Sequence, residues 1–199
     1  DLNQALDLLR ANSSLKAEKK ASRVAADGEV KVSKNSSYTT LVEINSETDF
    51  AAKDSQFKEF TNLVSEHMTQ TQINSIDDLN DLFSDQRQSL IQSIGENIQL
   101  RRLKTLETPQ GGLIGSYIHS DGKLAALVSI NIENKELAKD LAMHVSATNP
   151  SCLTADDMDP ELLKRERAIF LAQAPQSTVN PIYAPKKPPL PPVNGYTKY

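Results

Sequence analysis

The chain has 199 residues, and its 22 Lys and Arg against 26 Asp and Glu give a formal net charge of −4 at pH 7. This acidic balance argues against a general nucleic-acid binder, because neutralising phosphates needs clustered basic charge. The single cysteine excludes a disulfide framework and a cysteine-based metal cluster. The sequence contains no run of about 18 apolar residues, so it predicts no membrane span. The length predicts one domain or two small ones. These exclusions leave the binding of a protein partner or of a small ligand as the class of function.

Residues 1–27 predict a helix followed by a basic linker. Apolar residues recur over residues 1–10 at the spacing of one helix face: Leu2, Ala5, Leu6 and Leu9. Residues 13–23 carry four basic side chains and one acidic one, which fits either a solvated linker or a strip that faces an acidic partner. Because the chain begins with Asp1, we expect an upstream segment to be removed or missing, and no targeting segment is visible.

Residues 28–106 predict a β-hairpin, helices and a third strand. Two β-type runs over residues 29–33 and 38–45 flank a polar turn, and the second run alternates between two unlike faces. Asp54 is placed to cap a helix with an apolar stripe: Phe57, Phe60, Val64 and Met68. A further helical stretch over residues 76–94, with a break near Ser84, ends at Gly95, and residues 97–106 return to strand-like alternation.

Residues 107–174 predict a second, similar unit. Two runs over residues 112–120 and 123–131 flank Asp121-Gly122, a pair typical of a type I′ turn because both residues tolerate positive φ. Asn134 begins a helix that Asn149-Pro150 ends, and another helix begins at Asp159-Pro160. The pattern predicts an α+β fold of two related subdomains, each an antiparallel β-hairpin plus helices, joined by a helical segment.

Residues 175–199 are a proline-rich tail, with 7 of the 10 prolines between Pro175 and Pro192. Because proline lacks the amide N–H, this composition predicts an extended arm rather than helix or sheet. The arm either lies on a partner, through a polyproline II segment at residues 187–192, or is a simple tail.

The sequence contains none of the common motifs for covalent catalysis or phosphate-binding loops. Its three histidines, His67, His119 and His144, lack the spacing of a zinc site. Cys152 is expected to be a small, semi-buried residue rather than a nucleophile. We therefore expect a protein that is not an enzyme and needs no metal or cofactor.

The most unusual local sequence is the strand-to-helix turn that contains Thr48, Asp49 and Phe50. Phe50 has two interpretations. It lies seven residues before Phe57 and so extends the apolar stripe of the core. Alternatively, it projects as a wedge into a partner, whose polar groups meet the adjacent carboxylate.

Four segments in one order resemble the translation elongation factor Ts family: residues 43–60, residues 94–98 with Arg101-Arg102, residues 115–119 and residues 142–145. The resemblance covers about residues 1–174. It implies a guanine-nucleotide exchange factor that binds elongation factor Tu, GDP-bound or nucleotide-free, and promotes GDP release. By position it also implies a set of partner contacts: Thr48, Asp49, Phe50, Ile94, Gly95 and His119.

The sequence also departs from the family's pattern. Only the last helix of an N-terminal three-helix module is represented, Ala51 replaces the usual Val, and we expect the segment after Ala174 to lack the helix and final strand of the second subdomain. The alternative function is therefore a non-catalytic accessory subunit of a larger mitochondrial assembly, docked through the 175–199 tail. Residues 108–111 and the short C-terminal half are similar to mitochondrial members, which predicts a location in the mitochondrial matrix.

Overall fold

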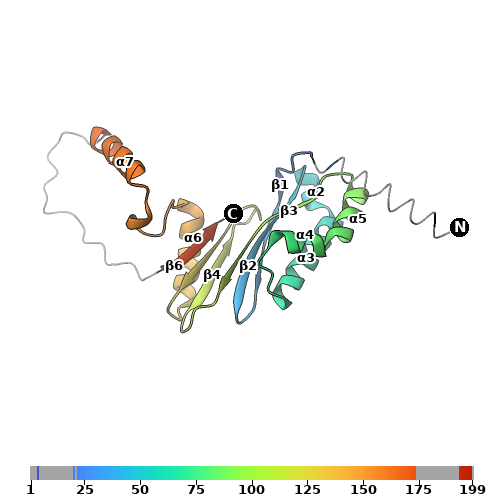
Figure 1. Cartoon of the computed structure of the whole chain (residues 1–199), viewed down its shortest axis with the longest axis horizontal. Helices are drawn as coiled ribbons and strands as arrows, with labels where there is room; N and C mark the ends of the chain where they lie inside the picture. Colours follow the sequence, from blue (N-terminus) through green and yellow to red (C-terminus); the bar gives the residue numbers. More distant parts are fainter. Residues whose placement is uncertain (1–3, 5–19, 21, 174–192, 199) are drawn as a thin grey trace.

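Two three-stranded antiparallel sheets form the centre of the molecule. The computed structural model describes residues 4, 20, 22–173 and 193–198 of the protein. One sheet has the order β1 (Asp27–Lys34), β2 (Tyr38–Ser46), β3 (Gln99–Glu107), and the other the order β4 (Leu113–Ile118), β5 (Ala125–Ile130), β6 (Val193–Lys198). The sheets pack against each other, and helices cover their outer faces (Figure 1). The predicted α+β fold of two related units is confirmed.

The first hairpin forms where the sequence predicts it. The Asn35 side chain accepts from the N–H groups of Ser37 and Tyr38 at 2.8 and 3.0 Å, which closes the turn between β1 and β2. Every residue of β2 is buried, because β2 is the central strand and both of its faces are covered. Val42 and Ile44 pack under the helices, whereas Leu41 packs against the second sheet.

The first unit contains the helices α2 (Asp49–Lys53), α3 (Ser55–Gln70), α4 (Ile76–Leu82) and α5 (Ser84–Ile94). Helices α3, α4 and α5 follow the predicted pattern, whereas α2 lies where the sequence predicts a turn. The Asp54 side chain caps α3 by accepting from the Gln56 N–H at 2.8 Å. The predicted stripe of α3 is buried: Phe57, Phe60, Val64 and Met68. The predicted break near Ser84 is confirmed at Phe83, between α4 and α5.

The second unit places α6 (Lys135–Thr148) on β4 and β5. Asn134 caps α6 and Asn149 ends it, as predicted, and the structure places Asn149 in the left-handed region. The predicted hairpin is confirmed, but the prediction of a type I′ turn is wrong. The loop spans residues 119–124, and only Gly122 in it has positive φ (71°). A bond from the Gly122 N–H to the His119 carbonyl (2.9 Å) closes a turn that needs no positive φ at Asp121.

Strand β6 corrects the prediction that the tail forms no sheet and that the final strand is missing. Residues 193–198 pair antiparallel with β5. The last proline is Pro192, so this segment keeps all its backbone donors and can form a ladder. The polyproline segment at residues 187–192 and, apart from residue 4, the helix predicted over residues 1–10 lie outside the described residues.

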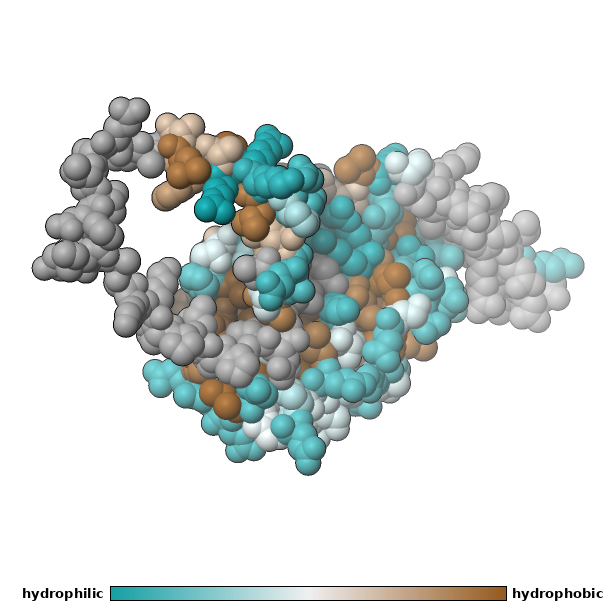
Figure 2. All heavy atoms as spheres, turned by 60° about the vertical axis from the view of Figure 1, so that its left-hand side comes forward, coloured by the Kyte–Doolittle hydropathy of each residue, from teal (hydrophilic) through white to brown (hydrophobic). Residues whose placement is uncertain are grey.

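A short 3₁₀ helix, η1 (Ala155–Asp157), precedes α7 (Pro160–Gln173). The predicted start of α7 is confirmed, since Asp159 accepts from the Glu161 N–H at 3.0 Å. Its apolar residues are exposed: Leu162, Leu163, Ile169, Phe170 and Leu171. Figure 1 shows α7 apart from the sheets, and Figure 2 shows apolar residues at the surface there. Cys152, before η1, is half-buried, as predicted.

Candidate partner-binding site

A five-residue helix, α2, presents two of the predicted contact residues. Thr48 is its N-cap, with extended backbone (φ −128°, ψ 160°), and its hydroxyl accepts from the Ala51 N–H at 3.3 Å. Asp49 in the first turn forms an ion pair with Lys53 at 2.7 Å. This hydrogen bond from Lys53 lowers the pKa of Asp49, so an exposed negative charge stands beside Phe50.

Phe50 is 81% exposed, whereas Phe57 is completely buried. The interpretation of Phe50 as part of the core stripe is therefore wrong. The physical reason is the extended backbone of Asp54 (ψ 142°), which separates α2 from α3. Because the two helices are not continuous, a seven-residue spacing across Asp54 does not place two side chains on one face. Instead α2 buries Ala51 and Ala52.

Ile94 and Gly95 end helix α5. Ile94 is half-buried against the first core, and Gly95 has φ 87°, in the left-handed region that favours glycine. The Gly95 N–H donates to the Ile91 carbonyl at 2.9 Å, and its own carbonyl accepts from Lys20 Nζ at 2.7 Å. These bonds fix the chain as it leaves the helix.

The structure brings this segment against the start of α2. The carboxylate of Glu96 accepts from the Thr48 N–H at 3.0 Å and from the Thr48 hydroxyl at 2.7 Å. In the opposite direction, Glu47 accepts from the Asn97 N–H at 2.6 Å. Two segments about 50 residues apart in the sequence therefore form one surface, and sequence reasoning missed both glutamates.

His119 comes from the second unit, in the β4–β5 loop. Its Nδ1 lies 3.1 Å from Asp121 Oδ1, and its side chain is about half exposed. The loop is anchored on β1: the Val30 N–H donates to the Gly122 carbonyl at 2.8 Å, and Lys123 pairs with Asp27 at 2.7 Å. The bond from Lys123 lowers the pKa of Asp27.

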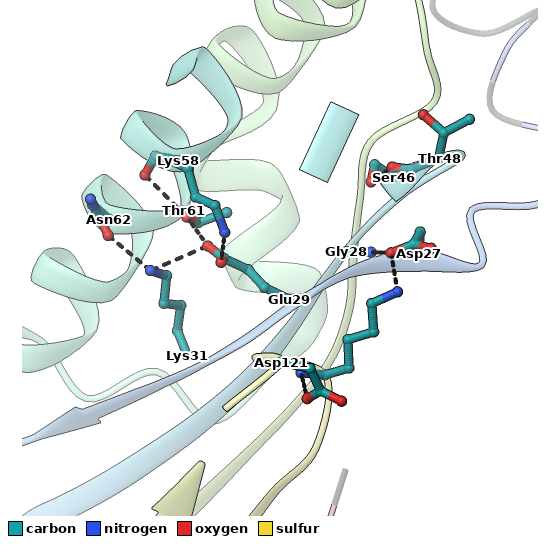
Figure 3. A network of polar contacts seen from close by, with 11 residues as sticks. Asp27, Gly28, Glu29, Lys31, Ser46, Thr48, Lys58, Thr61, Asn62 and Asp121 are labelled. Atoms are coloured by element: carbon teal, nitrogen blue, oxygen red, sulfur yellow. Dashed lines mark hydrogen bonds and ion pairs between the residues drawn. The ribbon is translucent and has the colours of Figure 1, made fainter. Parts of the chain in front are cut away.

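The same contacts place this loop at the end of the sheet where α2 begins. Asp27 is the register partner of Ser46, whose hydroxyl donates to the Thr48 carbonyl at 2.9 Å. Figure 3 shows Ser46 at the end of the strand beside Asp27, Thr48 just after that strand, and Asp121 on the loop below Asp27. The loop of His119 and the segment of Thr48 are thus joined through β1.

A buried carboxylate under α3 was also missed. Glu29 of β1 accepts hydrogen bonds from Lys58 and Thr61 of α3 and lies 3.2 Å from Lys31 (Figure 3). Burial raises the pKa of Glu29, but the bonds from Lys58 and Thr61 outweigh it, and the net pKa is lowered. Glu29 therefore stays charged and ties α3 to the sheet. The sequence signal for this contact is the pair Glu29 and Lys31, which are two residues apart and therefore on one face of β1.

The part of the chain that the structure describes holds no group of three or more His, Cys, Asp or Glu that could bind a metal ion. Within the same residues, none of the helices combines the length and the apolar character needed to cross a bilayer.

Comparisons with known proteins show the family of the chain. The sequence model of the family described as "Elongation factor TS" matches residues 47–188, which is more than half of the chain. The chain belongs to the elongation factor Ts family. The resemblance of the four sequence segments is therefore confirmed.

Individual relatives carry the same name. The elongation factor Ts of Hahella chejuensis is 42% identical over 180 residues, which cover 89% of this chain and 62% of that protein. The elongation factor Ts of Teredinibacter turnerae is 44% identical over 177 residues, or 87% of this chain and 60% of that protein. This chain thus spans about three fifths of the length of these relatives.

Proposed function

We propose that this chain is a guanine-nucleotide exchange factor that binds elongation factor Tu and accelerates the release of GDP during translation elongation. Membership of the elongation factor Ts family supports the proposal. The observation that carries it is Phe50, a large apolar side chain that is 81% exposed at the tip of a capped helix. The fold does not need a large apolar side chain at an exposed position, whereas a partner that buries this side chain gains binding free energy from it.

Such a factor forms no covalent bond. It binds the nucleotide-free partner more tightly than the GDP-bound one, and thermodynamic reciprocity then makes GDP bind the complex more weakly. A thousandfold faster release corresponds to about 4 kcal/mol of activation free energy. Full burial of one Phe side chain contributes about 1.5–3 kcal/mol, so Phe50 alone accounts for a large part of this difference.

The resemblance gives each residue a role in this proposal. Asp49 and Phe50 enter the partner near its Mg²⁺ site, with Phe50 between two partner helices. Ile94 and Gly95 form the second contact, and His119 approaches the nucleotide-binding domain. The joined surface of Thr48 and Glu96 supports simultaneous use of the first two contacts, while the second unit is left to dock on a more distant domain of the partner.

The accessory-subunit alternative gains nothing from the relatives, which carry the name elongation factor Ts. It depends on the 175–199 tail, of which residues 193–198 form β6 beside β5. Residues 175–192 and 199 lie outside the described part of the chain. The location in the mitochondrial matrix stays a prediction, and microscopy of the tagged protein in its source cells tests it.

The deciding experiment measures the release of a fluorescent GDP analogue from the matching elongation factor Tu. We expect the chain to accelerate release and the Asp49→Ala/Phe50→Ala variant to lose the acceleration. A folded chain that leaves the release rate unchanged contradicts the proposal and favours the accessory-subunit alternative. In that case, the mass of the native complex is the next measurement.

A further inference from the structure

Two glutamates lock the Thr48 segment and the Gly95 segment together. Glu96 takes both polar hydrogens of Thr48, the N–H at 3.0 Å and the hydroxyl at 2.7 Å. Glu47 takes the N–H of Asn97 at 2.6 Å and lies 3.6 Å from Arg23. Each turn thus supplies one carboxylate, and that carboxylate accepts from a backbone N–H of the other turn.

Glu96 also completes the N-terminus of α2. In a capping box, a Glu or Gln three residues after the N-cap accepts from the N-cap N–H. Here that position is Ala51, which has no acceptor. Instead Glu96, which lies 48 residues after the N-cap, accepts from the Thr48 N–H. By accepting the hydroxyl proton, it also turns a lone pair of Thr48 Oγ1 towards the Ala51 N–H.

Helix α2 needs this support because it has only five residues. A helix this short is not stable by itself, since nucleation costs more than a few hydrogen bonds return. Its packing is also small, because only Ala51 and Ala52 of α2 are buried. The orientation of Phe50 therefore depends on the cap to a greater extent than it does in a long, packed helix.

We propose that Glu96 is a positioning residue for nucleotide exchange: it holds α2 so that Phe50 and Asp49 are presented together with Ile94 and Gly95. This inference rests on the proposed function. Without the carboxylate, α2 is ordered in only a fraction of the molecules, and the apparent affinity for the partner falls by that fraction. A saturating concentration of the factor still selects the ordered form, because Phe50 itself is unchanged.

The test uses the full chain and the GDP-release assay. Glu96→Gln keeps the size of the side chain but has one acceptor oxygen in place of two, so it cannot accept from both the N–H and the hydroxyl of Thr48. We expect the half-saturating concentration to rise by about 10-fold, with the maximal release rate within about twofold of the parent. Thr48→Val, which lacks the hydroxyl, is expected to act in the same direction. Amide hydrogen exchange in residues 49–53 should be faster in Glu96→Gln.

A matched control separates positioning from a general loss of stability. Ser75 caps α4 by accepting from the N–H groups of Asp77 and Asp78, so Ser75→Ala removes a cap on another helix. We expect Ser75→Ala to release GDP like the parent.

The outcomes distinguish the two proposals. If the parent does not accelerate release, the proposed function is overturned and this role with it. If the parent is active and Glu96→Gln has parental half-saturation, only the positioning role is overturned. An equal loss of exchange in Ser75→Ala also overturns it.

Discussion

Replacing Phe50 by Ala tests the central residue of the proposed site. Full burial of a Phe side chain is worth about 1.5–3 kcal/mol, and 81% of Phe50 is open to solvent in the free protein. A partner that buries this exposed part gains about 1.2–2.4 kcal/mol. If this gain is made in the transition state of release, Phe50→Ala slows GDP release by about 8- to 60-fold.

The same exposure predicts that Phe50→Ala hardly changes the free energy of unfolding, because surface substitutions usually stay within about 0.5 kcal/mol. Phe57→Ala is the matched control. Phe57 is fully buried, and its removal is expected to cost about 3–5 kcal/mol. Urea unfolding and stopped-flow release of a fluorescent GDP analogue measure the two effects. A parental release rate in Phe50→Ala, or a loss of stability as large as that of Phe57→Ala, refutes the reasoning.

Three further predictions concern the scaffold. Gly95→Ala should destabilise the protein by about 1 kcal/mol in urea unfolding, because φ is 87° while a Cβ there meets only Lys20 Nζ at 3.8 Å; unchanged stability contradicts this. Gly115→Ala should cost about 1–3 kcal/mol or more, since its Cβ would lie 2.1 Å from the Ala138 carbonyl oxygen and push α6 off the sheet; a parental melting temperature argues against it. Because the pKa of Glu29 is lowered from 4.5, its stabilisation is present above pH 4.5 and is lost as the pH falls through its folded pKa. Glu29→Gln should therefore flatten the acid side of the pH–stability profile, and an equally steep profile contradicts the assignment.

Local sequence patterns predicted most of the secondary structure. The stripe of α3 was visible because a 3.6-residue period places buried side chains on one face, and it is buried as predicted. Asp54, Asn134 and Gly95 marked helix ends because capping depends on a few adjacent residues. The turn at Asp121 was mispredicted, because the hydrogen bonds of a six-residue loop differ from those of a two-residue turn.

The candidate site was only partly predictable. The positions of Thr48, Asp49 and Phe50 came from a resemblance, and the sequence left Phe50 with two interpretations. Its exposure depends on the extended backbone at Asp54, which ends one helix and begins the next. Strand β6 was missed for a related reason: its pairing partner, β5, lies more than 60 residues away in the sequence.

The sequence by itself therefore determined most of the order of helices and strands before β6, the residues of the first core and the family. Only the tertiary structure determined that Glu96 caps Thr48, that Glu47 holds Asn97, and that Phe50 faces solvent. Periodicity and caps arise from neighbours within a few residues, so they can be read locally. A carboxylate that satisfies a backbone N–H 48 residues away leaves no local pattern, because its partner is chosen by how the chain folds back.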